Sequence, residues 1–105
     1  MHLQVQITTP TKEIAQQILQ QLLEARLIAC GQIMGPITSL YHWQGKIEQS
    51  EEYLCLLKTT QAVYSALEEK IATAHPYEVP EIIAIPITNG HSPYLNWITK
   101  EMKGF

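Results

Sequence analysis

The chain has 105 residues, of which 46% are hydrophobic, and its formal net charge is −3, from ten glutamates and no aspartate against seven lysines and arginines. This length predicts one domain spanning residues 1–105, and the apolar content excludes a disordered chain. The acidic balance argues against nucleic acid as a partner. No apolar run approaches the ~18 residues that cross a membrane, which argues against a membrane partner. The first residues carry no secretion-signal pattern, so we expect a cytoplasmic protein.

The chain begins with an alternating pattern that is typical of a half-buried strand. Leu3, Val5 and Ile7 alternate with polar side chains. Thr9 and Pro10 then predict the start of a helix, with Thr9 as its N-cap. Apolar residues recur at helical spacing over the next four turns and predict an amphipathic helix. These residues are Ile14, Ile18, Leu22 and Ala25.

The next segment predicts a long β-hairpin. Two glycines and a proline interrupt its first strand and indicate a bulge or bend. They are Gly31, Gly35 and Pro36. Gln44-Gly45 is a two-residue turn signal, and the return strand is predicted from Lys46 to about Lys58. Because Leu54–Leu57 is apolar on both faces, we expect helices to cover one face and another subunit to cover the other.

The second half of the chain predicts another helix, a strand and a last helix. The helix ends at His75 because the residue before a proline avoids the helical conformation. Ile82–Ile85 is a β-branched strand that Pro86 ends at an edge, and Ser92-Pro93 caps the final helix. The element order predicts an α+β fold, a ferredoxin-like βαββαβ sandwich with a long central hairpin and a short C-terminal helix.

The two cysteines, Cys30 and Cys55, are far apart in the sequence and lie among apolar neighbours, so we expect reduced, buried thiols. The sequence has no glycine-rich phosphate loop, no nucleophile elbow and no close pair of cysteines. No pair of a nucleophile and a base is evident either, and we expect no enzymatic activity.

Residues 75–81, HPYEVPE, are the most unusual stretch of the chain. Two prolines stiffen a loop that carries an imidazole, a phenol and two carboxylates. One interpretation is a ligand or metal site, because these donors are crowded on a rigid backbone. The other is a helix end at which His75 bonds to the backbone and Glu81 pairs with a lysine.

A second cluster, Tyr41–Trp43, lies beside the hairpin turn. These side chains either line a pocket or pack across the hairpin and at a subunit interface. Lys58 follows apolar residues, and such a lysine usually has a carboxylate partner, for which Glu81 or Glu48 could serve.

Several motifs together resemble one protein family. They are Ala29-Cys30, Pro36–Glu48 (PITSLYHWQGKIE), Leu57–Thr60 (LKTT), His75–Ile82 (HPYEVPEI), Gly90 and Tyr94–Ile98. In this order they closely resemble the CutA divalent-cation tolerance proteins over almost the whole chain. The resemblance implies a homotrimer, similar in architecture to PII-like signalling proteins, with clefts where subunits meet. It also implies a role in tolerance to copper and other divalent cations, with no cofactor required.

The resemblance further implies which residues line the inter-subunit cleft. They are Ser39, Tyr41, Trp43, Lys58, His75, Tyr77 and Glu81. In the bacterial member associated with copper, the proposed ligands fall here on Ile7, Ala74 and His75, of which only His75 offers a metal-binding side chain. We therefore expect a copper(II) or other divalent-cation site to include His75. The groups considered for completing it are His42, Glu78, Glu81 and donors of another subunit.

Two other functions are open at this point. The first is a PII-like binding or adaptor module whose clefts hold a small metabolite or a protein partner, in which case Lys58 matters more than His75. The second is a structural role without any ligand.

Overall fold

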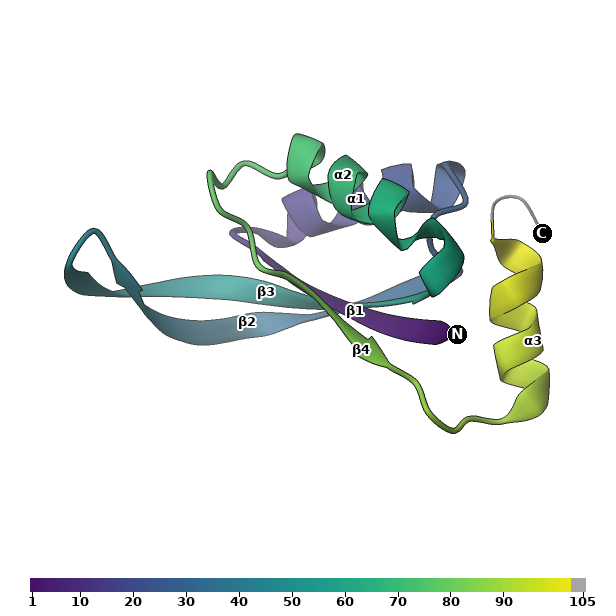
Figure 1. Ribbon diagram of the computed structural model, residues 1–105. Coiled ribbons are helices and arrows are strands. Elements are labelled where there is room, and N and C mark those ends of the chain that lie inside the picture. Colours follow the sequence, from purple (N-terminus) through teal and green to yellow (C-terminus); the bar gives the residue numbers. More distant parts are fainter. Residues whose placement is uncertain (103–105) are drawn as a thin grey trace.

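Figure 1 shows the computed structural model, which describes residues 1–102. The elements are β1 (His2–Thr9), α1 (Lys12–Glu24), β2 (Cys30–Trp43), β3 (Lys46–Thr60), η1 (Gln61–Val63), α2 (Tyr64–Ala74), β4 (Ile82–Pro86) and α3 (Ser92–Glu101). The four strands form one antiparallel sheet in the order β2-β3-β1-β4. The helices α1 and α2 lie on one face of it (Figure 1). The predicted α+β class and element order are confirmed.

The core lies between the sheet and these two helices. In the ladder between β1 and β3, Val5 is opposite Leu57 and Ile7 is opposite Cys55, and all four side chains are fully buried. From α1 and α2 come Ala15, Ile18, Leu19, Leu22, Leu67 and Ile71. The alternation in β1 and the helical period in α1 therefore mark the residues that are removed from water.

Helix α1 begins two residues later than the sequence suggested. Thr11, not Thr9, is the N-cap, and its hydroxyl oxygen accepts a hydrogen bond from the Ile14 backbone N–H at 3.1 Å. Thr9 still pairs with Tyr53 in the sheet, so its backbone stays extended. Its hydroxyl donates to the Thr11 carbonyl at 2.9 Å. Sheet pairing thus outweighs the local capping signal.

The hairpin of β2 and β3 has the predicted bulge and turn. The bulge lies between Met34 and Ile37 and contains a cis Gly35–Pro36 peptide bond. At Gly35 a Cβ atom would lie 2.6 Å from Cδ2 of Tyr53, so only glycine fits there. Gln44 and Gly45 form the turn with φ angles of 50° and 78°. The hairpin projects beyond the helices, and the molecule measures 44 × 26 × 22 Å (Figure 1).

The other face of the sheet, here called the open face, carries apolar side chains that α1 and α2 do not cover. The register places Met34, Leu54, Leu56, Ile83 and Ile85 on it, together with Gln4, Gln6, Gln32 and Lys58. Ile83 and Ile85 are 46% and 43% exposed. The expectation that Leu54–Leu57 of β3 is apolar on both faces is confirmed, since Cys55 and Leu57 face the helices and Leu54 and Leu56 lie on the open face.

Helix α3 stands across one end of the sheet, near the N-terminus (Figure 1). Its Ile98 and the following Met102 are buried, and the Thr59 hydroxyl lies 3.5 Å from the Met102 sulfur. The Tyr94 hydroxyl lies 3.4 Å from Sγ of Cys30. Both cysteines are free, as expected, but only Cys55 is buried, because Cys30 lies on the partly exposed side of β2. Within residues 1–102, no helix combines the length and the apolar character that crossing a membrane requires.

Candidate functional site

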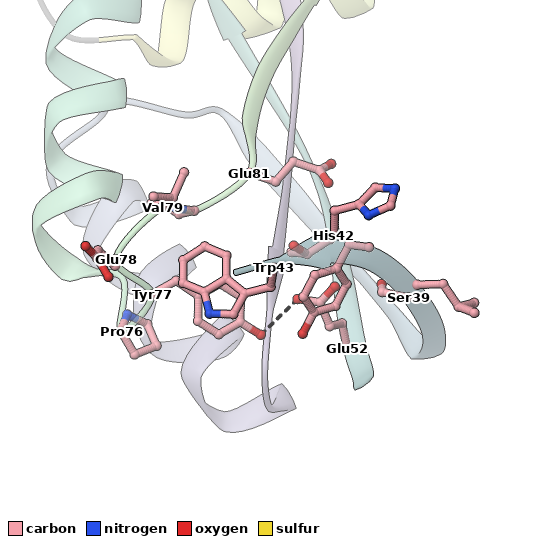
Figure 2. Close-up of a pocket in the computed structure, with 13 residues that line it drawn as sticks. Ser39, His42, Trp43, Glu52, Pro76, Tyr77, Glu78, Val79 and Glu81 are labelled. Atoms are coloured by element: carbon pink, nitrogen blue, oxygen red, sulfur yellow. Dashed lines mark hydrogen bonds between the residues drawn. The ribbon is translucent and has the colours of Figure 1, made fainter. Parts of the chain in front are cut away.

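A pocket of about 750 Å³ lies between the distal half of β2 and the loop that joins α2 to β4 (Figure 2). Its lining residues are Thr8, Ser39, Leu40, Tyr41, His42, Trp43, Glu52, Pro76, Tyr77, Glu78, Val79, Pro80 and Glu81. The pocket thus brings the Tyr41–Trp43 cluster and the HPYEVPE loop together. Of the side chains expected to line a cleft, Ser39, Tyr41, Trp43, Tyr77 and Glu81 lie here.

The loop is tied to the sheet near both of its ends. The Tyr77 hydroxyl donates a hydrogen bond of 2.8 Å to Oε2 of Glu52, which is only 7% exposed (Figure 2). The Gln6 side-chain amide donates to Oε2 of Glu81 at 3.0 Å. Burial and the Glu52 carboxylate raise the pKa of the Tyr77 hydroxyl, so it keeps its proton and acts as a donor. These contacts hold the carboxylates of Glu52 and Glu81 at the pocket wall.

His75 lies behind the pocket and does not line it. The backbone N–H of Tyr77 donates to its Nδ1 at 3.1 Å, so Nε2 carries the proton and donates to the Thr8 carbonyl at 2.7 Å. The ring is 93% buried, since its exposed fraction is 7%. The structure therefore has the backbone-bonded arrangement that was one of the two interpretations of this loop. A metal ion could reach His75 only by displacing one of these hydrogen bonds.

Lys58 also lies outside the pocket, on the open face. Its ammonium group donates to Oε1 of Gln32 at 2.8 Å, and the expected carboxylate partner is not found there. Glu81 is bonded to Gln6 instead, and Glu48 pairs with Tyr41 far along the hairpin. The prediction of a Lys58–Glu81 or Lys58–Glu48 pair was therefore wrong.

The charged groups that line the pocket are acidic. Glu52, Glu78 and Glu81 line it with His42, and its described lining contains no lysine or arginine. Within residues 1–102, however, no three His, Cys, Asp or Glu side chains are grouped closely enough to hold a metal ion. A single chain thus presents an acidic pocket without a complete set of metal ligands.

Glu52 is the main pocket residue that the sequence did not single out. It follows another glutamate in the polar first half of β3, and nothing local distinguishes it from Glu51. Its position depends on the register beyond the bulge, where it pairs with Ile37. That long-range pairing has no signature in a single sequence.

The fold and the pocket define the class of protein: a ferredoxin-like α+β domain with a pocket beside its hairpin and an apolar sheet face that α1 and α2 do not cover. Residues 3–101 match the family model described as CutA1 divalent ion tolerance protein. The chain belongs to this family, and the resemblance seen in the sequence motifs is confirmed.

Individual relatives agree with this assignment. The chain is 45% identical to the divalent-cation tolerance protein CutA of Thermus thermophilus, over 90% of this chain and 91% of the relative. It is 38% identical to that of Escherichia coli O139:H28, over 91% and 86% of the two chains.

Solved structures are similar over nearly the whole chain. The Thermus thermophilus Cut A1 structure matches with a TM-score of 0.96 and 42% identity, over 98% of this chain and all of the other. A structure from Archaeoglobus fulgidus, described as a periplasmic divalent cation tolerance protein CutA, matches with a TM-score of 0.95 and 37% identity over the same shares.

Proposed function

We propose that this protein acts in divalent-cation tolerance as a homotrimer that binds a divalent cation, with copper(II) the first candidate. The observation that carries the proposal is the acidic pocket between β2 and the loop after α2. Carboxylate oxygens bind divalent cations, and an imidazole such as that of His42 suits copper or zinc. The cation is the cargo of this protein, and no enzymatic step is proposed for it.

The carboxylates of Glu52 and Glu81 suit this role because each can bind a cation in addition to the hydrogen bond that it accepts within the chain. Oε2 of Glu52 accepts a hydrogen bond from Tyr77 and Oε2 of Glu81 accepts one from Gln6, so each carboxylate keeps a second oxygen that can bind a cation. Glu78 and His42 are exposed at the rim. Since residues 1–102 of one chain do not group three ligands, the proposal needs donors from a second copy or a rearrangement that frees His75.

The open face supports self-association. Its exposed isoleucines, Ile83 and Ile85, lie in one sheet with the half-buried Leu54 and Leu56. A stable interface between subunits removes on the order of 1,000 Å² per subunit from water, and an apolar sheet face is the surface that gains most from this. A trimer is the assembly implied by the sequence resemblance.

The same pocket disfavours a small anionic metabolite, because its described lining offers three glutamates and no cationic side chain. The relatives and structures named above are all CutA proteins, so the alternative of a metabolite-binding or adaptor module has no specific support. A cytoplasmic location is part of the proposal and rests on two free cysteines. Cell fractionation would test it, since one relative is described as periplasmic.

The test is equilibrium dialysis of metal-stripped protein against copper(II), with native mass spectrometry of the same samples. We expect saturable copper binding that Glu81→Gln weakens and that the matched variant Glu13→Gln, on the outer face of α1, leaves unchanged. His75→Ala shows whether the buried imidazole takes part. Absence of saturable binding in the wild-type trimer would contradict the metal role, and a monomeric mass would contradict the assembly.

A further inference from the structure

The pocket is much larger than a metal ion requires. Its volume of about 750 Å³ corresponds to roughly 25 water molecules at about 30 Å³ each, and it lies within the range of roughly 300–1,000 Å³ that is typical of sites for small organic molecules. A divalent cation is held by a few oxygen or nitrogen atoms at about 2.0–2.6 Å. Most of this pocket would have no part in such a site.

Aromatic rings make up a large share of the lining. Tyr41 and Trp43 belong to β2 and are 42% and 40% exposed. Tyr77 belongs to the loop that joins α2 to β4, and Figure 2 labels Trp43 and Tyr77 among the lining residues. Neither Tyr41 nor Trp43 stacks on another aromatic ring within residues 1–102, whereas Trp97 on α3 stacks on Tyr94 at 5.7 Å. Among the described residues, the faces of Tyr41 and Trp43 are thus not taken up by other aromatic rings, whereas the Tyr77 ring lies 4.6 Å from that of His75.

An aromatic face attracts a cation, because the quadrupole of the ring is negative above its plane. The pocket combines such faces with the carboxylates of Glu52, Glu78 and Glu81, and its described lining has no positive side chain to compete. Pro76 and Val79 of the loop add apolar surface at the same site. Rings, carboxylates and aliphatic side chains together fit a cation that also has a hydrocarbon part.

We propose that this pocket binds an organic ammonium ion. The ammonium group lies among the rings of Tyr41 and Trp43 and the pocket carboxylates, and the alkyl part contacts Pro76 and Val79. A metal ion would use the carboxylates and an imidazole and would not need the aromatic faces, so this inference does not depend on the proposed metal binding.

The test is isothermal titration calorimetry of the metal-free, full-length protein with choline and with its neutral isostere 3,3-dimethylbutan-1-ol, which has the same shape without the charge. We expect saturable binding of choline and at least tenfold weaker binding of the alcohol. Butylamine, titrated in parallel, distinguishes attraction by the carboxylates from attraction by the aromatic rings. A primary ammonium that binds more tightly than choline assigns the main role to the carboxylates, and the reverse order assigns it to the rings; both support the site.

The variants use matched residues elsewhere in the chain. Trp43→Leu should weaken choline binding by roughly two- to thirtyfold, the range expected for one cation–π contact. Trp97→Leu, which removes an equally exposed tryptophan on α3, should leave the affinity unchanged. Native mass spectrometry establishes that each variant keeps the wild-type assembly. Copper binding is measured by dialysis on the wild type and choline binding on the metal-free protein, so either proposal can fail while the other stands.

Two results would overturn the inference. One is the absence of saturable binding for every ammonium probe at millimolar concentration. The other is equal binding of choline and the neutral alcohol, or equal losses in Trp43→Leu and Trp97→Leu, since either would place the effect outside a charge-selective aromatic pocket.

Discussion

The hydroxyl of Tyr77 donates a hydrogen bond of 2.8 Å to Oε2 of Glu52, and this contact joins the loop after α2 to the middle of β3. The two residues are 25 positions apart in the sequence. Glu52 is almost fully buried, so this hydroxyl replaces water that the carboxylate would otherwise bind. The contact therefore both stabilises the fold and orients one wall of the pocket.

Tyr77→Phe should lower the free energy of unfolding by about 1–3 kcal/mol, because it leaves a buried carboxylate oxygen without its donor. Guanidinium unfolding at a fixed protein concentration measures this. Tyr64→Phe is the matched control, since it removes the exposed Tyr64–Glu68 hydrogen bond of 2.8 Å and should change stability by no more than about 0.5 kcal/mol. Equal losses of unfolding free energy in the two variants would show that the buried Tyr77–Glu52 hydrogen bond stabilises the fold no more than an exposed one.

Leu22 and Leu23 are neighbours on α1 with opposite environments: Leu22 is fully buried, whereas Leu23 is 41% exposed. Leu22→Ala should cost about 2–5 kcal/mol of unfolding free energy, because it removes core contacts and leaves a cavity. Leu23→Ala should cost clearly less. The same chemical unfolding experiment measures both, and a larger loss at Leu23 would contradict the observed orientation of α1.

Ile83→Glu tests the open face. In the proposed trimer, a glutamate on this apolar face would bury an unpaired charge, so we expect the variant to have a lower mass than the wild type at the same concentration. Leu23→Glu, an equally drastic change on the opposite, helical side of the molecule, should keep the wild-type assembly. Analytical ultracentrifugation measures both masses. Retention of the wild-type mass by Ile83→Glu would show that this face is not the interface.

Cys55 makes part of the stability depend on alkaline pH. Burial raises the pKa of its thiol from 9.0 to about 11. The unfolded chain therefore loses this proton near pH 9 while the folded chain keeps it to about pH 11, and the contribution present below pH 9 is lost as the pH rises through that window. The free energy of unfolding should fall there by up to about 1.4 kcal/mol per pH unit from this group.

Cys55→Ala isolates that contribution. The tyrosines that ionise at similar pH are present in both proteins, so the difference between the two pH profiles reports Cys55 alone. We expect a shallower fall in the variant, measured by chemical unfolding at several pH values from 8 to 11. Parallel profiles would mean that the thiol is solvated in the folded state.

The sequence predicted the elements where short-range chemistry decides them. Proline at position 76 ends α2 at Ala74, and Gln44-Gly45 makes the hairpin turn. Local signals failed where tertiary pairing competed with them. Thr9 has the residue type of an N-cap, but its place in the β1–β3 ladder moved the cap to Thr11. The prediction of a carboxylate partner for Lys58 was wrong for the same reason, because the strand register places Gln32 next to Lys58.

By itself, the sequence determined the order of strands and helices, the apolar character of both faces of β3 and the family, since periodicity, turn residues and motifs are local or linear properties of the chain. Only the tertiary structure decided which residues share the pocket. The pocket is built from segments that are far apart in the sequence: Thr8, the end of β2, Glu52 and residues 76–81. The strand register, the bulge at Gly35–Pro36 and the hydrogen bonds of the loop bring these segments together. The same long-range packing placed His75 behind the pocket and Lys58 on the open face. Such pairings depend on the whole sheet, and no local pattern encodes them.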